Sequence, residues 1–101
     1  MKLVVIMSIQ ESTNMLRKLL TENNVLVFSE LEMKGFKRFP MPDKRDNWFA
    51  HDQNETYSHL VFTVVESEKA DELIEAIRRQ LQGVDNLNPV HAFVTNVEQF
   101  L

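Results

Sequence analysis

Two runs of consecutive apolar residues predict strands that are buried on both faces. Residues 2–7 read KLVVIM, and residues 57–65 read YSHLVFTVV. Both runs are rich in β-branched side chains, which favour strands. Because successive side chains of a strand point to opposite faces, apolar residues at every position indicate burial on both sides.

Two further strands complete the predicted set. Residues 25–34 alternate between two mixed faces from Val27 onward, as expected of an edge strand, and Gly35 closes the clear part of this pattern. Residues 90–97, VHAFVTNV, form the fourth predicted strand.

Apolar positions spaced three and four residues apart predict two helices. Ser12 or Thr13 offers the first helix an N-cap, and Asn23 or Asn24 can end it in the left-handed conformation. Ser67 can cap the second helix, and Gly83 stops it. The apolar positions are Met15, Leu16, Leu19 and Leu20 in the first helix, where Arg17 and Lys18 turn away, and Ala70, Leu73, Ile74, Ile77 and Leu81 in the second.

The resulting order βαββαβ is the split βαβ arrangement of ferredoxin-like α+β domains. Right-handed crossovers place both helices on one face of a four-stranded antiparallel sheet, with the strands in the order four, one, three, two. A chain of 101 residues can bury one core and no second one. We therefore predict a single domain over residues 1–101.

The second face of this predicted sheet has no element to cover it. Nevertheless, the first and third strands carry apolar residues on both faces: Leu3, Val5 and Met7 against Val4 and Ile6, and Leu60, Phe62 and Val64 against Val61 and Val65. An uncovered apolar face of about several hundred Å² marks an interface. We predict a homo-oligomer that packs sheet face against sheet face.

Residues 36–56 contain Pro40 and Pro42 and show no sustained period, so we expect a long loop. Structureless loops beyond about 12–15 residues are uncommon in compact domains and are usually functional. The net charge of the chain is −4, but five basic residues stand against the single acid Asp43 within residues 34–45: Lys34, Lys37, Arg38, Lys44 and Arg45. The negative net charge argues against general nucleic-acid binding, whereas the local basic patch favours one anionic ligand or partner. The alternative is a solvated edge that deters aggregation.

The remaining composition excludes several classes. The chain has no cysteine, which excludes disulfides and thiolate sites. Its longest apolar run is far shorter than the roughly 18 residues of a membrane span, and residues 3–7 are too short for a signal-peptide core. We expect a cytoplasmic protein with no membrane insertion.

The predicted topology gathers polar residues at one end of the sheet. Strand directions bring together residues 8–13, Gly35, loop 36–56, residues 57–59, loop 82–89 and His91. Loops at one end of a rigid sheet are the usual place for a ligand site.

The element order, the length and the segment FSELEMKGFKR, residues 28–38, followed by a long loop, resemble the PII signal-transduction family. This resemblance implies a homotrimeric regulatory protein, not an enzyme. It also implies that a small-molecule ligand lies between subunits; in the family this ligand is an adenine nucleotide. Loop 36–56 is then expected to signal to a target protein. The ligand-binding residues predicted on these grounds are Gly35, Lys37, Arg38, Lys44, Arg45, His59 and His91.

The sequence departs from the family at its phosphate-binding positions. Lys37 replaces the family's second glycine, Phe39 replaces a glutamine that helps to bind metal–nucleotide and 2-oxoglutarate, and His59 aligns with a lysine. The loop after the second helix, QGVDNLNPVH, has one glycine and no basic residue, whereas backbone amides and basic side chains hold phosphates. The chain therefore resembles a divergent PII-like protein, for which a nucleotide is one candidate ligand.

A divalent metal is the alternative ligand. His51, His59 and His91 are all predicted at the loop end, and imidazole is the commonest metal ligand. CutA-like divalent-ion tolerance proteins share the trimeric fold. His59 and His91 begin strands that are separated by the first strand, so a metal would bridge them more easily between subunits than within one subunit. The alternative to a metal site is that all three are ordinary strand-end histidines.

Aromatic residues crowd the long loop. Phe39, Trp48 and Phe49, beside Phe36 and Tyr57, are typical of interface anchors and predict contact with a partner protein. They could instead stack on a base, or fold back on a neighbouring subunit.

The sequence contains no recognisable catalytic motif. A nucleophile at Ser12, Thr13 or Ser29 would need a histidine and an orienting acid within reach, and no nucleophile-elbow or metalloprotease spacing is present. Glu30 and Glu32 share one face of a strand, where we expect them to face solvent.

Overall fold

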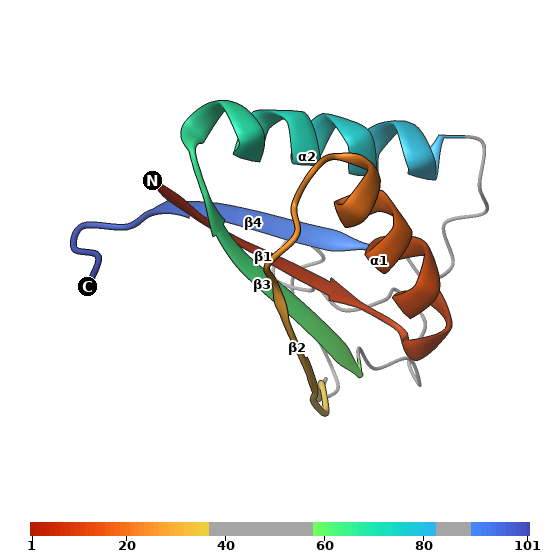
Figure 1. Ribbon diagram of the computed structural model, residues 1–101. Helices are drawn as coiled ribbons and strands as arrows, with labels where there is room; N and C mark the ends of the chain where they lie inside the picture. Colours follow the sequence, from red (N-terminus) through yellow and green to blue (C-terminus); the bar gives the residue numbers. More distant parts are fainter. Residues whose placement is uncertain (37–57, 83–89) are drawn as a thin grey trace, which may run out of the picture.

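The computed structural model describes residues 1–36, 58–82 and 90–101, and these form one α+β domain (Figure 1). Its elements are β1 (Lys2–Ser8), a short 3-10 helix (Gln10–Ser12), α1 (Thr13–Glu22), β2 (Ser29–Glu32), β3 (His59–Val65), α2 (Ser67–Leu81) and β4 (His91–Asn96). This βαββαβ order confirms the predicted ferredoxin-like arrangement. Neither helix in these ranges is long and apolar enough to cross a membrane.

The four strands form one sheet in the order β2-β3-β1-β4, as predicted. Every neighbouring pair is antiparallel, and β1 lies at the centre with Ile6 opposite both Val61 of β3 and Ala92 of β4. Both helices cover the same face of the sheet (Figure 1). The two long apolar strands predicted from consecutive apolar residues are therefore the two central strands.

The edge strand β2 is shorter than its sequence pattern predicts. Only Ser29–Glu32 pairs with β3, whereas the alternation extends over residues 25–34. The residues before β2 do not pair with β3. Val25 is buried in the core, whereas Leu26 and Val27 are 77% and 84% exposed. The Thr63 hydroxyl donates to the Val27 carbonyl at 2.8 Å. The reversal after α1 uses Asn24 at φ 62°, which confirms the predicted left-handed residue.

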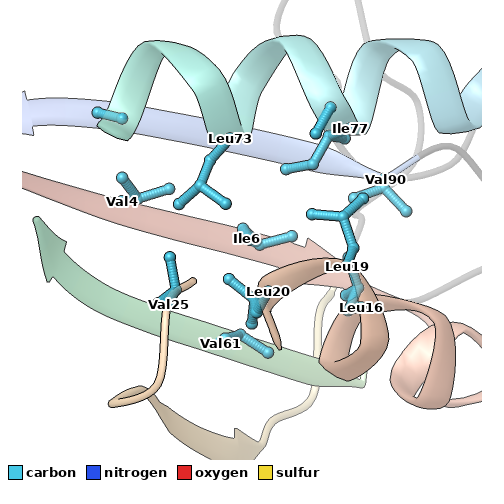
Figure 2. Close-up of a cluster of buried hydrophobic side chains, with 12 residues drawn as sticks. Val4, Ile6, Leu16, Leu19, Leu20, Val25, Val61, Leu73, Ile77 and Val90 are labelled. Atoms are coloured by element: carbon cyan, nitrogen blue, oxygen red, sulfur yellow. The ribbon is translucent and has the colours of Figure 1, made fainter. Parts of the chain in front are cut away.

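The core lies between the two helices and the covered face of the sheet (Figure 2). Leu16 and Leu20 of α1 and Leu73 of α2 are fully buried, and they form one cluster with Val4 and Val61 of the sheet. The 3.6-residue period that predicted both helices thus identified the side chains that hold them to the sheet. Burying one such side chain stabilises the fold by about 1.5–3 kcal/mol.

The helix ends differ in detail from the expected caps. Ser12 occupies the N-cap of α1 but makes no side-chain capping bond. Ser67 is the first residue of α2, and its N-cap is Glu66, so the predicted Ser67 cap is wrong by one position. Gly83, the expected stop of α2, lies outside the described residues.

The second face of the sheet carries apolar side chains that no described element covers. Successive cross-strand rows place Leu3 beside Val64, Val5 between Phe62 and Phe93, and Met7 beside Leu60. Phe62 is 37% and Phe93 is 44% exposed, although both belong to strands of the sheet. The uncovered apolar face predicted from the sequence is therefore present in the described part of the chain.

We predict that Leu20→Ala lowers the free energy of unfolding by about 2–5 kcal/mol, because truncation of a fully buried leucine leaves a cavity in the core. The matched control is Leu26→Ala, at a 77% exposed position, where we expect a change within about 0.5 kcal/mol. Urea denaturation followed by circular dichroism measures both. Equal effects of the two substitutions would contradict the location of the core.

Candidate functional site

Four strand ends meet at one end of the sheet, and they bring the predicted polar residues together. Ser8, the last residue of β1, pairs with His59, the first of β3. Glu32, the last residue of β2, also lies opposite His59, and Met7 lies opposite His91, the first residue of β4. The convergence expected from strand directions is thus confirmed for these positions.

The two histidines at this end lie on opposite faces of the sheet. His59 pairs with Ser8, which belongs to the helix-covered face, whereas His91 pairs with Met7, which belongs to the uncovered face. His59 is accordingly buried at 6% exposure, and partial burial of His91 lowers its pKa below the ordinary value. One subunit therefore does not bring these imidazoles to a common point. Within residues 1–36, 58–82 and 90–101, no group of three histidine or acidic side chains is placed to hold a metal.

An ion pair joins α1 to the edge strand beside His59. The Nε and a terminal nitrogen of Arg17 donate to the two carboxylate oxygens of Glu30, each at 2.7 Å. This two-point contact lowers the pKa of Glu30 below its ordinary value, since the hydrogen bonds and charge of Arg17 favour the ionised carboxylate. The Glu30 side chain is only 21% exposed, so its expected position in open solvent is wrong, whereas Glu32 is exposed as expected.

His59 presents a buried nitrogen next to this ion pair. Its Nε2 lies 3.8 Å from the nearer Glu30 oxygen, which is too far for a hydrogen bond, and makes no other hydrogen bond. The hydroxyl oxygens of Ser8 and Thr13 are likewise buried without a hydrogen-bond partner. A buried polar group that lacks a partner costs about 1–3 kcal/mol. Three such groups lie close together in the sequence or by strand pairing: Ser8 ends β1, Thr13 begins α1 and His59 lies opposite Ser8.

Thr13, His59 and the Arg17–Glu30 pair line a cleft between α1 and β2. The cleft has a volume of about 220 Å³ and is lined by Gln10, Thr13, Arg17, Glu30, Leu31, Glu32 and His59. A second hollow of about 470 Å³ adjoins it, and Gln10 and Glu32 line both. Met33, Lys34 and Ser58 complete the second hollow. Together they form a groove at the end of the sheet that extends from Arg17 to Lys34.

The predicted site residues divide between this end of the sheet and the undescribed segment. Gly35 is buried, and the next residue, Phe36, is 74% exposed. The other predicted ligand and partner residues lie outside the described residues: Lys37, Arg38, Phe39, Lys44, Arg45, Trp48, Phe49 and His51.

The Arg17–Glu30 pair was missed by the sequence analysis. Arg17 was correctly expected to turn away from the apolar face of α1, but nothing in the sequence assigned its partner. Glu30 lies thirteen positions further on, in a different element, and only the packing of α1 over the sheet brings the two together. The pairing of Ser8 with His59, fifty-one positions apart, was implied only by the strand directions.

The arrangement of Thr13, Glu30 and His59 differs from that of a nucleophilic triad. A hydroxyl nucleophile needs a histidine base that is itself hydrogen-bonded to an orienting acid. Here Glu30 directs both carboxylate oxygens to Arg17 and leaves His59 Nε2 at 3.8 Å. The cleft thus offers hydrogen-bonding groups without the bonded acid–histidine pair.

Comparison with known proteins adds no relative to this picture. No protein-family model matches the chain, and no curated protein matches it at a significant level. What is established is therefore the ferredoxin-like α+β fold, and the function must be argued from the residues themselves.

We predict that Glu30→Gln flattens the dependence of stability on pH in the acid range. The pKa of Glu30 is lower in the folded state than in the unfolded state, where it is about 4.3. The ionised carboxylate therefore stabilises the fold fully above the unfolded-state pKa, and this stabilisation is lost as the pH falls through the folded-state pKa. Urea denaturation at pH 7, 5, 4 and 3 should show that the difference in free energy of unfolding between wild type and the variant shrinks as the pH falls. Glu98→Gln, at an exposed position, is the control and should follow wild type. A constant difference between wild type and Glu30→Gln would contradict the assignment.

Proposed function

We propose that this chain is a homo-oligomeric regulatory protein of the PII-like type. It binds a small anionic ligand between subunits and signals to a partner protein through residues 36–56. The observation that carries this proposal is the uncovered apolar face of the sheet. A regulatory function that depends on sites between subunits requires such a surface on every copy.

The side chains of this face support its role as a subunit interface. Phe62, Val5 and Phe93 form one continuous cross-strand row, and the two phenylalanines are substantially exposed in the single chain. Covering apolar surface contributes about 25 cal/mol per Å². Stable interfaces bury roughly 800 Å² on each partner, and they are enriched in aromatic side chains at their centre. A homotrimer is the assembly that the PII resemblance favours.

The ligand part of the proposal rests on the basic residues that follow Gly35. Lys34, the residue before this glycine, lines the groove at the end of the sheet. Lys37, Arg38, Lys44 and Arg45 follow shortly afterwards and would provide charge for an anion such as a nucleotide or a second messenger. Phe39, Trp48 and Phe49 would then serve as anchors for the target protein.

Metal binding at the subunit interface is the second candidate. It is favoured by the position of His91 on the uncovered face, where a neighbouring subunit would meet it. Burial lowers the pKa of His91 and keeps the imidazole neutral at pH 7, which is the form that binds a metal. Another copy, or His51 of the long loop, would supply the remaining ligands.

We expect sedimentation at micromolar concentration to give three times the subunit mass of 11.9 kDa. Phe62→Lys should produce a folded monomer, because a charge at the centre of the apolar face cannot be buried without a partner. Leu26→Lys is the matched control at an exposed apolar position away from this face, and it should leave the assembly unchanged. A wild-type monomer would refute the oligomeric part of the proposal.

A thermal-shift screen of nucleotides, second messengers and divalent metals tests the ligand. At 100 times Kd a ligand stabilises the folded state by about 2.7 kcal/mol, which raises the Tm of a domain this size by roughly 10 °C or more. Lys44→Ala/Arg45→Ala should remove the shift caused by an anionic ligand. Lys18→Ala/Arg79→Ala removes the same charge from exposed helix positions and should leave the ligand-induced Tm shift unchanged. Equal shifts in the two double variants would show that the basic patch does not bind the ligand.

A further inference from the structure

We propose that the cleft between α1 and β2 is a separate binding site for a small ligand that carries a protonated amine. The site uses Glu32, His59 and Thr13, with Gln10 at its edge, and is distinct from the anion site proposed for residues 36–56. It rests on the described residues alone, so either proposal can fail without the other.

The charge in the cleft favours a cation. Among the described residues that line it are the carboxylates of Glu30 and Glu32, the guanidinium of Arg17 and the imidazole of His59. Arg17 offsets Glu30 through the contact at 2.7 Å, which leaves the carboxylate of Glu32 in excess. An anion such as a phosphate would meet this carboxylate, whereas an ammonium group would form a charge-assisted hydrogen bond with it.

The hydrogen-bonding groups of the cleft match the donors of an ammonium. The Nε2 of His59 is buried, has no hydrogen-bond partner and belongs to a side chain that lines the cleft. In a neutral imidazole whose proton is on the other nitrogen, this atom accepts a hydrogen bond. The carboxylate of Glu32 and the amide oxygen of Gln10 are further acceptors on the walls. An ammonium offers three donors, one for each of these groups.

The Thr13 hydroxyl provides a second recognition point. Its oxygen is buried without a partner, and Thr13 lines the same cleft as His59. A hydroxyl both donates and accepts, so it can bind a polar group of the ligand next to the amine. The Arg17–Glu30 pair also lines the cleft, and its two hydrogen bonds join α1 to β2.

The volume of the cleft suits a small molecule. A volume of about 220 Å³ is below the 300–1,000 Å³ typical of drug-sized ligands, and the adjoining hollow leaves room for a short extension past Glu32. A metal ion fits the site less well, because no triad of metal-binding side chains is assembled in the part of the chain that the structure describes.

The test is a titration of the full chain, labelled with ¹⁵N, with ethanolamine and putrescine. Ethylene glycol and acetate serve as matched probes that lack the ammonium. We expect saturable shifts of the backbone amides of residues 10–13 and 30–34 with both amines, with a Kd on the order of millimolar for such small probes. Neither matched probe should produce them.

Two variants assign the binding to this cleft. Glu32→Gln keeps the shape of an exposed side chain and removes its charge, and it should weaken ethanolamine binding about tenfold. Thr13→Val should weaken it to a smaller extent. Glu98→Gln makes the same chemical change at the opposite end of the sheet and should leave Kd unchanged. Absence of shifts with both amines, equal shifts with acetate, or equal weakening by Glu32→Gln and Glu98→Gln would each overturn the proposal.

Discussion

The burial of one face of the sheet by two helices is the constraint on which the rest of the structure depends. Leu16, Leu20 and Leu73 approach the sheet from the helices and pack in one cluster with Val4 and Val61. Their removal from water holds α1 and α2 on the same face. It also leaves the second face to the solvent or to another subunit, although that face is built from valine, leucine and phenylalanine side chains. The sheet therefore has two apolar faces, of which the two helices cover one.

The same packing creates the polar site at one end of the sheet. Because α1 lies over the edge of the sheet, Arg17 reaches Glu30 of β2. Because β1 and β3 are antiparallel neighbours, Ser8 comes to lie opposite His59 under the start of the helix. The apolar core ends here, and buried polar groups take its place. Such groups lower the stability of the fold unless a hydrogen-bond partner satisfies them.

Much of the fold could be predicted from the sequence, and the errors have clear causes. The 3.6-residue period identified Leu16, Leu20, Leu73 and Ile77 correctly, since a helix needs one apolar face whatever its neighbours are. The length of β2 was overestimated because alternation reports which side chains are apolar, not whether a neighbouring strand is present to pair with them. The candidate site was predictable only as a location: strand directions indicated its end of the sheet, whereas the Arg17–Glu30 contact required the position of α1.

The order of the elements, the buried face of each helix and the apolar character of both sheet faces follow from the local spacing of side chains, so the chain specifies them without any long-range contact. The face on which each strand-end residue lies depends instead on how the strands pair. His59 and His91 are both first residues of strands, but pairing with Ser8 turns one toward the helices and pairing with Met7 turns the other away. Strand register joins positions far apart in the chain, and a shift by one residue reverses the face of every side chain. The local sequence around each histidine does not contain that information.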